Sequence, residues 1–194
     1  SLKYFFIIVL SAQIITNIFY LKTTKHKDFI TEPLSPFLTE IFSLGDKQFL
    51  FRFLVLKAQN FGDNWGNFTP LSELDYNKIY AHLNMLDTLD DKSNLAPFIA
   101  AYIYGITQVS DDSIKIIDYL KKHSLKNPET KWRWLVHALY LARHRIKDDS
   151  LALDIAYILA RLNVSEIPIW TKQFPAFILA DIGRNNEALL ILNS

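Results

Sequence analysis

Apolar residues at a helical spacing are the feature that most restricts the fold of this chain. Residues 45–60 are strongly apolar, and a spacing of three to four follows in the segments 74–89, 96–107, 112–123, 131–146, 150–162, 168–183 and 186–192. No stretch of useful length alternates between apolar and polar residues, as a half-buried strand does. The pattern predicts an all-α domain whose short connections make neighbouring helices antiparallel.

Local signals for helix starts agree with these segments. Ser110-Asp-Asp-Ser113 and Asp148-Asp-Ser150 each precede a predicted helix, and their side-chain oxygens suit the first backbone amides. Pro128 and Pro168 lie near two further starts, where a missing amide hydrogen is tolerated. Residues 61–70 are rich in turn residues and predict a loop.

Composition excludes several classes of protein. The chain is 50% hydrophobic and 21% charged, which is incompatible with intrinsic disorder. Its 21 Lys and Arg residues against 20 Asp and Glu residues give a net charge of +1, so no strong field predicts binding to nucleic acid. The absence of cysteine excludes disulfides, thiol catalysis and thiolate metal sites.

The N-terminal segment carries an uncharged, largely apolar run over residues 4–21, with lysines on both sides and aromatic residues at both ends. As a helix the run spans about 27 Å, close to the hydrocarbon thickness of a bilayer. We therefore predict a single transmembrane anchor within residues 1–27, in contact with lipid through residues 4–21. A cleaved signal peptide and a buried core helix are the alternatives, and the flanking lysines leave the side of the soluble domain undetermined.

Four polar residues of this run recur at helical spacing and share one face: Gln13, Thr16, Asn17 and Tyr20. Polar groups in hydrocarbon are costly unless paired, so this face is predicted to meet another transmembrane helix. Alternatively, the groups bond to their own backbone or lie near the interface. Residues 28–40 contain two prolines and no clear period, which predicts a linker before a helical domain at 41–194.

Small residues mark an internal repeat. Ala101, Ala138 and Ala176 fall in the middle of successive predicted helices. The partner helices align through Ala81, Ile117, Ala152 and Ala188. In the last unit, Gly183 follows Ala176 by seven residues and Ala188 follows five later, as in the tetratricopeptide pattern of close packing, turn and second helix.

Three stretches resemble bacterial membrane-anchored tetratricopeptide-like proteins: Phe42–Asp63, Leu74–Asp90 and Trp134–Ala138. The resemblance implies a TPR-like α-solenoid of antiparallel helix pairs behind one anchor in the bacterial inner membrane. It carries over no catalytic residue.

The repeat register also predicts a groove. Trp132 and Trp170 stand six residues before an alanine landmark. One residue after the landmarks stand Tyr102, Leu139 and Phe177. These five residues are the candidate groove, and large aromatic side chains there suit a protein partner. Trp134 falls at a packing position in this register, while the alternative for the groove aromatics is that they pack against a neighbouring repeat.

The sequence offers little support for a catalytic or metal-binding site. Asp87, Asp90 and Asp91 are predicted to form a solvated turn and cap, and His137 and His144 lack the spacing and third ligand of a zinc site. The sequence predicts no catalytic, cofactor-binding or metal-binding residues, no cofactor and no enzyme activity. The predicted function is a membrane-anchored protein-interaction scaffold or an accessory or assembly subunit of a membrane complex, without nucleic acid. The alternatives are an enzyme or metal-binding protein with a site built from scattered polar residues, or a nucleic-acid-binding helical repeat.

Overall fold

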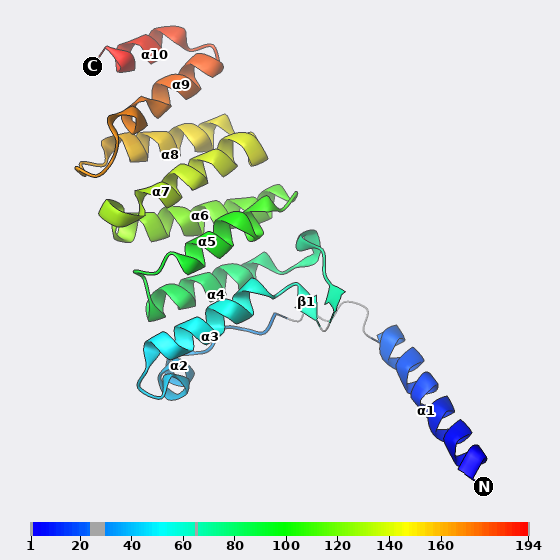
Figure 1. Cartoon of the computed structure of the whole chain (residues 1–194). Helices are drawn as coiled ribbons and strands as arrows, with labels where there is room; N and C mark the ends of the chain where they lie inside the picture. Colours follow the sequence, from blue (N-terminus) through cyan, green and yellow to red (C-terminus); the bar gives the residue numbers. More distant parts are fainter. Residues whose placement is uncertain (1, 24–29, 65, 194) are drawn as a thin grey trace.

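The computed structural model describes residues 2–23, 30–64 and 66–193, with the side chains of residues 2, 17–23, 64 and 67 outside the description. Helices dominate the described residues (Figure 1), which confirms the predicted all-α class. The α-helices are α1 (Leu2–Thr23), α2 (Pro36–Ser43), α3 (Lys47–Gln59), α4 (Tyr76–Leu89), α5 (Leu95–Tyr102), α6 (Ser110–Lys126), α7 (Pro128–Tyr140), α8 (Asp149–Arg161), α9 (Phe174–Asp181) and α10 (Asn185–Leu192).

Short irregular elements join the helices. Three are 3₁₀ turns, η1 (Leu71–Glu73), η2 (Tyr104–Ile106) and η4 (Ile169–Gln173), and one is a π-helical turn, η3 (Leu141–Ile146), that extends α7. The predicted loop at 61–70 contains a two-residue antiparallel ladder between β1 (Asp63–Asn64) and β2 (Asn67–Phe68).

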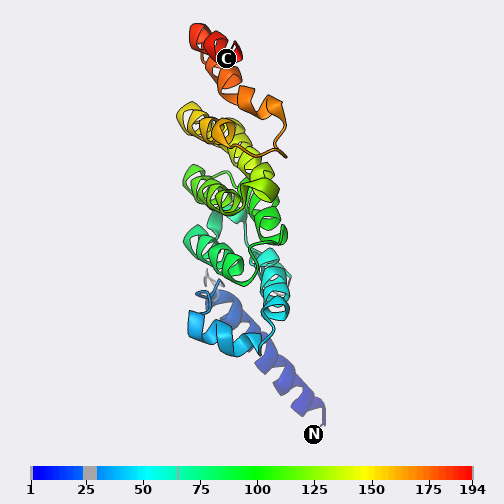
Figure 2. The ribbon, with the colours of Figure 1, turned by 90° about the vertical axis from the view of Figure 1, so that its left-hand side faces the viewer.

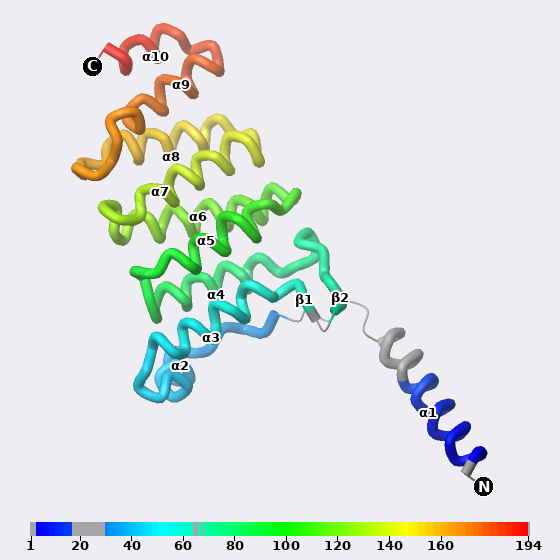
Figure 3. The backbone as a smooth tube through the Cα atoms, viewed as in Figure 1, coloured from blue at the N-terminus to red at the C-terminus, as the bar shows by residue number. Residues whose placement is uncertain are grey.

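The helices from α3 onward stack in two layers (Figure 2). We call α3, α5, α7 and α9 the odd layer, and α4, α6, α8 and α10 the even layer. Consecutive helices pack against each other, and α4 also packs against α6 and α5 against α7. The chain runs back and forth across the stack from α2 to α10 (Figure 3), which is the general arrangement of an α-solenoid.

The core lies between the two layers and explains the repeat signal. Ala101, Ala138 and Ala176 are all buried, because helices approach closely only where side chains are small. Large side chains fill the remaining space, including Ile79, Leu86, Ile116, Leu120, Leu135 and Ile155. In the last pair, Ala176, Leu179 and Ala188 form a small cluster apart from the main core.

The predicted start signals act as expected at α7 and α8 but not at α6, which begins at Ser110 after Val109 and has no side-chain cap, so Ser110–Ser113 lie inside the helix. Asp148 Oδ1 accepts a hydrogen bond from the backbone N–H of Leu151 at 2.9 Å and caps α8. Pro128 occupies the first turn of α7. Pro175 also falls in a first turn, that of α9, because Ile169–Gln173 is a 3₁₀ turn and the α-helix begins only at Phe174.

The predicted linker at 28–40 requires a correction. Its second half is helical from Pro36, where Ser35 Oγ caps α2 by accepting the backbone N–H of Leu38 at 3.3 Å. Ile30 is buried in the core beside α3 and α4 residues. A proline at a first helical position was a start signal here rather than a sign of a linker. Residues 24–29 lie outside the described part of the chain.

Helix α1 lies apart from the stack, and its described side chains from Lys3 to Thr16 are exposed (Figure 1). Among the described residues, no helix is found that is long and apolar enough to cross a bilayer. Gln13 is exposed, and the Thr16 hydroxyl donates to the backbone oxygen of Ala12 at 2.7 Å, which is the local alternative for that side chain. The side chains of Asn17 and Tyr20 lie outside the described residues.

Candidate interaction surface

The outward side of α5 carries large apolar side chains, and the helix contains no charged residue. Ala96 and Ala100 face the core, so Leu95, Phe98 and Tyr102 fall on the opposite side. Phe98 and Tyr102 keep 48% and 49% of their surface exposed. A surface helix normally turns a single apolar stripe inward, whereas α5 is apolar on both sides.

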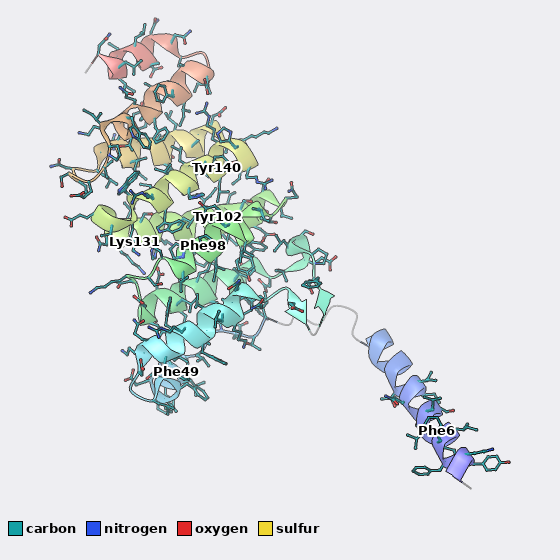
Figure 4. All side chains as sticks on the ribbon, in the orientation of Figure 1. Phe6, Phe49, Phe98, Tyr102, Lys131 and Tyr140 are labelled. Carbon is teal, nitrogen blue, oxygen red and sulfur yellow. The ribbon has the colours of Figure 1, made fainter. Side chains whose placement is uncertain are left out.

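Helix α7 packs beside α5 and continues this surface. The rings of Tyr102 and His137 meet edge to face with centroids 4.6 Å apart, and Trp134 stacks on His137 at 5.8 Å. Tyr140 is exposed on the same helix. We call Phe98, Tyr102, Trp134, His137 and Tyr140 the aromatic face; Figure 4 labels three of them.

A hydrogen bond joins the two helices within the aromatic face. The Tyr102 hydroxyl and Nε2 of His137 lie 2.5 Å apart. Burial lowers the pKa of His137, so its imidazole is neutral at pH 7. The surface therefore presents uncharged rings in a defined mutual orientation.

A buried ammonium group fixes the start of α7. Lys131 Nζ donates hydrogen bonds to the backbone oxygens of Lys92 and Ser93 and to Oδ1 of Asn94. The indole N–H of Trp134 donates to the same Asn94 Oδ1 at 3.0 Å. Burial lowers the pKa of Lys131, while nearby carboxylates act in the opposite direction. These bonds tie α7 to the α4–α5 turn and hold Trp134 in position before any ligand arrives.

A cleft of about 460 Å³ opens between α5 and α7 beside the aromatic face. Its lining includes Tyr102, Ile106, Tyr140 and Leu141, with Arg145 as its charged member. Such a volume lies within the range of natural binding clefts, which are mainly apolar with a few polar groups. The cleft can accept an apolar side chain next to a group that pairs with a guanidinium.

Basic residues predominate in α3, α5, α7 and the η3 turn, whereas α9 of the odd layer carries the acidic residue Asp181. Among α3, α5, α7 and the η3 turn, Glu129 is the only acidic residue. The basic residues of the same elements are Lys47, Arg52, Lys57, Lys131, Arg133, Arg143 and Arg145. In the even layer, α6 and α8 carry residues of both signs. Lys131 is buried and Arg143 pairs with Asp181 of α9, so Arg133 and Arg145 are the exposed bases that make the surface around the aromatic face electropositive.

The five predicted groove residues differ in how much of their surface is exposed. Tyr102 lies in the aromatic face, and Trp170 and Phe177 are nearly half exposed on η4 and α9. Trp132 and Leu139, in contrast, are buried, with 5% and 4% of their surface exposed. This corrects the prediction for those two residues.

The burial of Trp132 matches the alternative of packing against a neighbouring unit. Its ring meets Trp170 edge to face at 6.3 Å. Trp134, predicted at a packing position, is partly buried against the core. Of the two tryptophans, Trp132 is the more deeply buried.

Sequence reasoning missed Phe98 and Tyr140 as surface residues, and it interpreted His137 as a surface or partly packed histidine without placing it in an interaction surface. The signal was present in α5, where Phe98 and Tyr102 are four residues apart on the side opposite Ala96 and Ala100. The same signal recurs in α3, where Phe49, Phe53 and Leu56 are exposed opposite the core.

The sequence predicted that Asp87 belongs to a solvated turn, and this prediction is wrong. Its carboxylate is buried between α4 and α6 and accepts hydrogen bonds from the Tyr119 hydroxyl at 2.9 Å, from His123 Nδ1 at 2.9 Å and from Lys126 Nζ at 3.0 Å. Burial opposes ionisation of Asp87, but these donors hold its pKa below the ordinary value. Asp90 does behave as predicted, since it accepts the backbone N–H groups of Lys92 and Ser93.

The arrangement of the described residues gives little support to the alternatives of a metal site and a nucleic-acid-binding surface. No group of three or more His, Cys, Asp or Glu side chains there is arranged to hold a metal ion. Basic residues of α6 and the η3 turn are paired with acids. Lys122 lies 2.8 Å from Asp118, and Arg143 forms an ion pair with Asp181.

The fold and surface together define a helical stack of antiparallel pairs with an aromatic, electropositive face on one layer. Comparison of the chain with protein-family models, curated proteins and solved structures finds no match. The resemblance to tetratricopeptide-like proteins therefore stays a prediction.

Proposed function

We propose that this protein is a membrane-attached interaction scaffold that binds a partner protein through the aromatic face. The exposed rings of Phe98, Tyr102 and Tyr140, gathered beside a cleft, carry the proposal. Contiguous exposed apolar surface on a soluble domain usually marks a binding site. Tyrosine, tryptophan and arginine are also the residues that most often dominate binding energy.

The partner segment is acidic and carries at least one large apolar side chain. The apolar side chain fills the cleft between α5 and α7, where Arg145 pairs with a neighbouring carboxylate. The excess of basic residues on the odd layer steers an acidic segment toward this face. Because Lys131 and Asn94 already hold α7 and Trp134 in place, little side-chain entropy is lost on binding.

Attachment to a membrane rests on the N-terminal sequence. The uncharged run at 4–21 has the length and the terminal aromatic residues of a bilayer anchor. The polar face that includes Gln13 and Thr16 is proposed to meet a helix of the same membrane complex. In this proposal the protein acts as an accessory or assembly subunit of a bacterial inner-membrane complex, with α1 holding the scaffold beside its partner.

The full-length chain, solubilised from membranes in mild detergent, tests the role of the aromatic face. Replacing Phe98 and Tyr102 with Ser together removes two exposed rings of the face. We expect about a tenfold loss of co-purified partner, since removal of anchor residues commonly costs more than 1.4 kcal/mol. The measurement is quantitative mass spectrometry of the recovered complex.

Ile114 and Leu125 provide a matched control, because both are exposed apolar residues of α6 in the even layer. The double variant Ile114→Ser and Leu125→Ser should retain the partner. Unchanged recovery with the Phe98 and Tyr102 variant contradicts the proposal. Equal loss with both double variants places recognition elsewhere, and thermal unfolding of each variant shows whether the fold is intact.

A further inference from the structure

Helix α2 has its apolar side turned outward. Phe37, Ile41 and Phe42 are exposed, whereas Ser43 is buried and Thr39 partly buried. A helix of a soluble protein shows the opposite arrangement, with its apolar stripe on the core. A cleft of about 330 Å³ lies between α2 and α4, so the inner side of α2 is not sealed against the core.

The turn after α2 adds a strained, exposed leucine. Leu44 has φ 50° and ψ 29°, and 84% of its surface is exposed. The left-handed conformation costs about 1–2 kcal/mol for a residue with a side chain. With so little of its surface covered, Leu44 gains little packing within the chain to offset that cost.

Phe49, in the first turns of α3, is exposed on the same connection (Figure 4). We call Phe37, Ile41, Phe42, Leu44 and Phe49 the apolar corner. These side chains come from α2, the turn after it and the first turn of α3, and none of them lines the cleft between α2 and α4. The aromatic face differs, because Tyr102, His137 and Tyr140 line a cleft themselves.

Charge around the apolar corner is balanced. Lys47 and Glu40 lie 3.7 Å apart, and Asp46 caps α3 by accepting the Phe49 N–H. Residues 36–52 contain two acids, Glu40 and Asp46, and two bases, Lys47 and Arg52, so their formal charges sum to zero. A corner without net charge does not attract a charged partner, so the fitting occupant is an apolar phase.

The apolar corner lies at the same end of the stack as α1, opposite α10 (Figures 1 and 2). Ile30 is already buried in the stack, so residues 24–29 lead from α1 to it and reach at most about 25 Å, and α2 begins six residues after Ile30. A bilayer that holds α1 is therefore within reach of the corner.

We propose that the apolar corner enters the interface of a lipid bilayer, with α2 lying along the membrane surface. This inference rests on the proposed membrane attachment and adds a second contact to it. The apolar side of a helix in this position sits about 5–10 Å into the boundary between headgroups and acyl chains. The corner thereby fixes how the solenoid stands on the membrane and where the aromatic face is presented.

The absence of native cysteine allows a unique label to test this position. An environment-sensitive fluorophore is attached to the full-length chain through Leu44→Cys, and separately through Leu190→Cys on exposed α10 as the control. With neutral phosphatidylcholine vesicles, the label at position 44 should shift to the blue and lose most of its emission to lipid-borne nitroxides. The label at position 190 should do neither.

Adding Phe37→Asp and Ile41→Asp to the Leu44→Cys chain should return the label at position 44 to water. If the chain floats with vesicles but that label stays in water, the inference is wrong while the proposed attachment stands. A blue shift without quenching by nitroxide lipids assigns the corner to a protein contact and also overturns the inference. If the chain does not float with vesicles, the proposed attachment itself fails.

Discussion

Asp87 shows how strongly the role of one residue depends on its surroundings. The sequence places it one turn from two further acids near a helix end, yet its carboxylate is the centre of a buried network with Tyr119, His123 and Lys126. Among the described side chains, His123 Nε2 is buried without a hydrogen-bond partner. The imidazole therefore depends on Asp87 for its one polar contact.

Replacement of Asp87 with Ala should destabilise the fold by about 3–5 kcal/mol, because it leaves a buried imidazole and an ammonium without their acceptor. Urea unfolding at pH 7 measures this change. Since the pKa of Asp87 is lowered in the folded state, its contribution is present above the ordinary value of 3.8 and disappears as pH falls through the folded pKa. The difference between wild type and variant should thus shrink in acid.

Asp91 is the control for this experiment because it is exposed on the following turn. Asp91→Ala should change stability by less than about 0.5 kcal/mol. A similar small effect of Asp87→Ala would show that the buried network contributes nothing net.

Among the elements, the end of α9 illustrates a turn that local sequence specifies. Gly183 has φ 82°, and the two bonds of a Schellman motif close the helix. The N–H of Arg184 donates to the oxygen of Leu179 at 2.8 Å, and the N–H of Gly183 to that of Ala180 at 3.0 Å. The predicted turn glycine of the last unit is confirmed.

Gly183→Ala should destabilise the protein by about 1–2 kcal/mol, because a residue with a Cβ is strained at this φ. Nothing lies within 4 Å of the added Cβ, so the effect is conformational rather than steric. Gly183→Asn should cost less, since Asn tolerates the left-handed region. Thermal unfolding of the two variants tests the order, and equal stabilities would contradict it.

The α5 and α7 helices show what a local pattern leaves open. The small residues Ala101 and Ala138 correctly identify buried positions, but the rotation of α7 about its own axis follows from contacts far away in sequence. Lys131 bonds to the α4–α5 turn, and in the resulting orientation of α7 Trp132 is buried and Trp134 partly buried.

Across the whole molecule, stability should be uneven along the stack. The last pair, α9 and α10, has its own small cluster of Ala176, Leu179 and Ala188, and Leu153 packs against both this cluster and the main core. In a solenoid each unit is stabilised mainly by its neighbours. The terminal pair therefore opens at a lower free energy than the centre.

Hydrogen–deuterium exchange measured by mass spectrometry checks this expectation. Amides of α9 and α10 should exchange well before those of α4, α6 and α7. Leu153→Ala should accelerate exchange in α9 and α10 more than in α4. Uniform protection from α3 to α10 would show that the stack unfolds as one cooperative unit.

The period of the apolar residues by itself determined that the domain is all-α and approximately where each helix from α3 to α10 lies, because helix formation depends on residues three and four apart. Asp148, Pro128 and Gly183 act within a single turn of backbone, so their roles could also be deduced locally. Only the tertiary structure decided that Asp87 and Trp132 are buried and that α2 turns its apolar side outward. Each of these depends on which surfaces of distant helices meet, and short-range spacing carries no information about that.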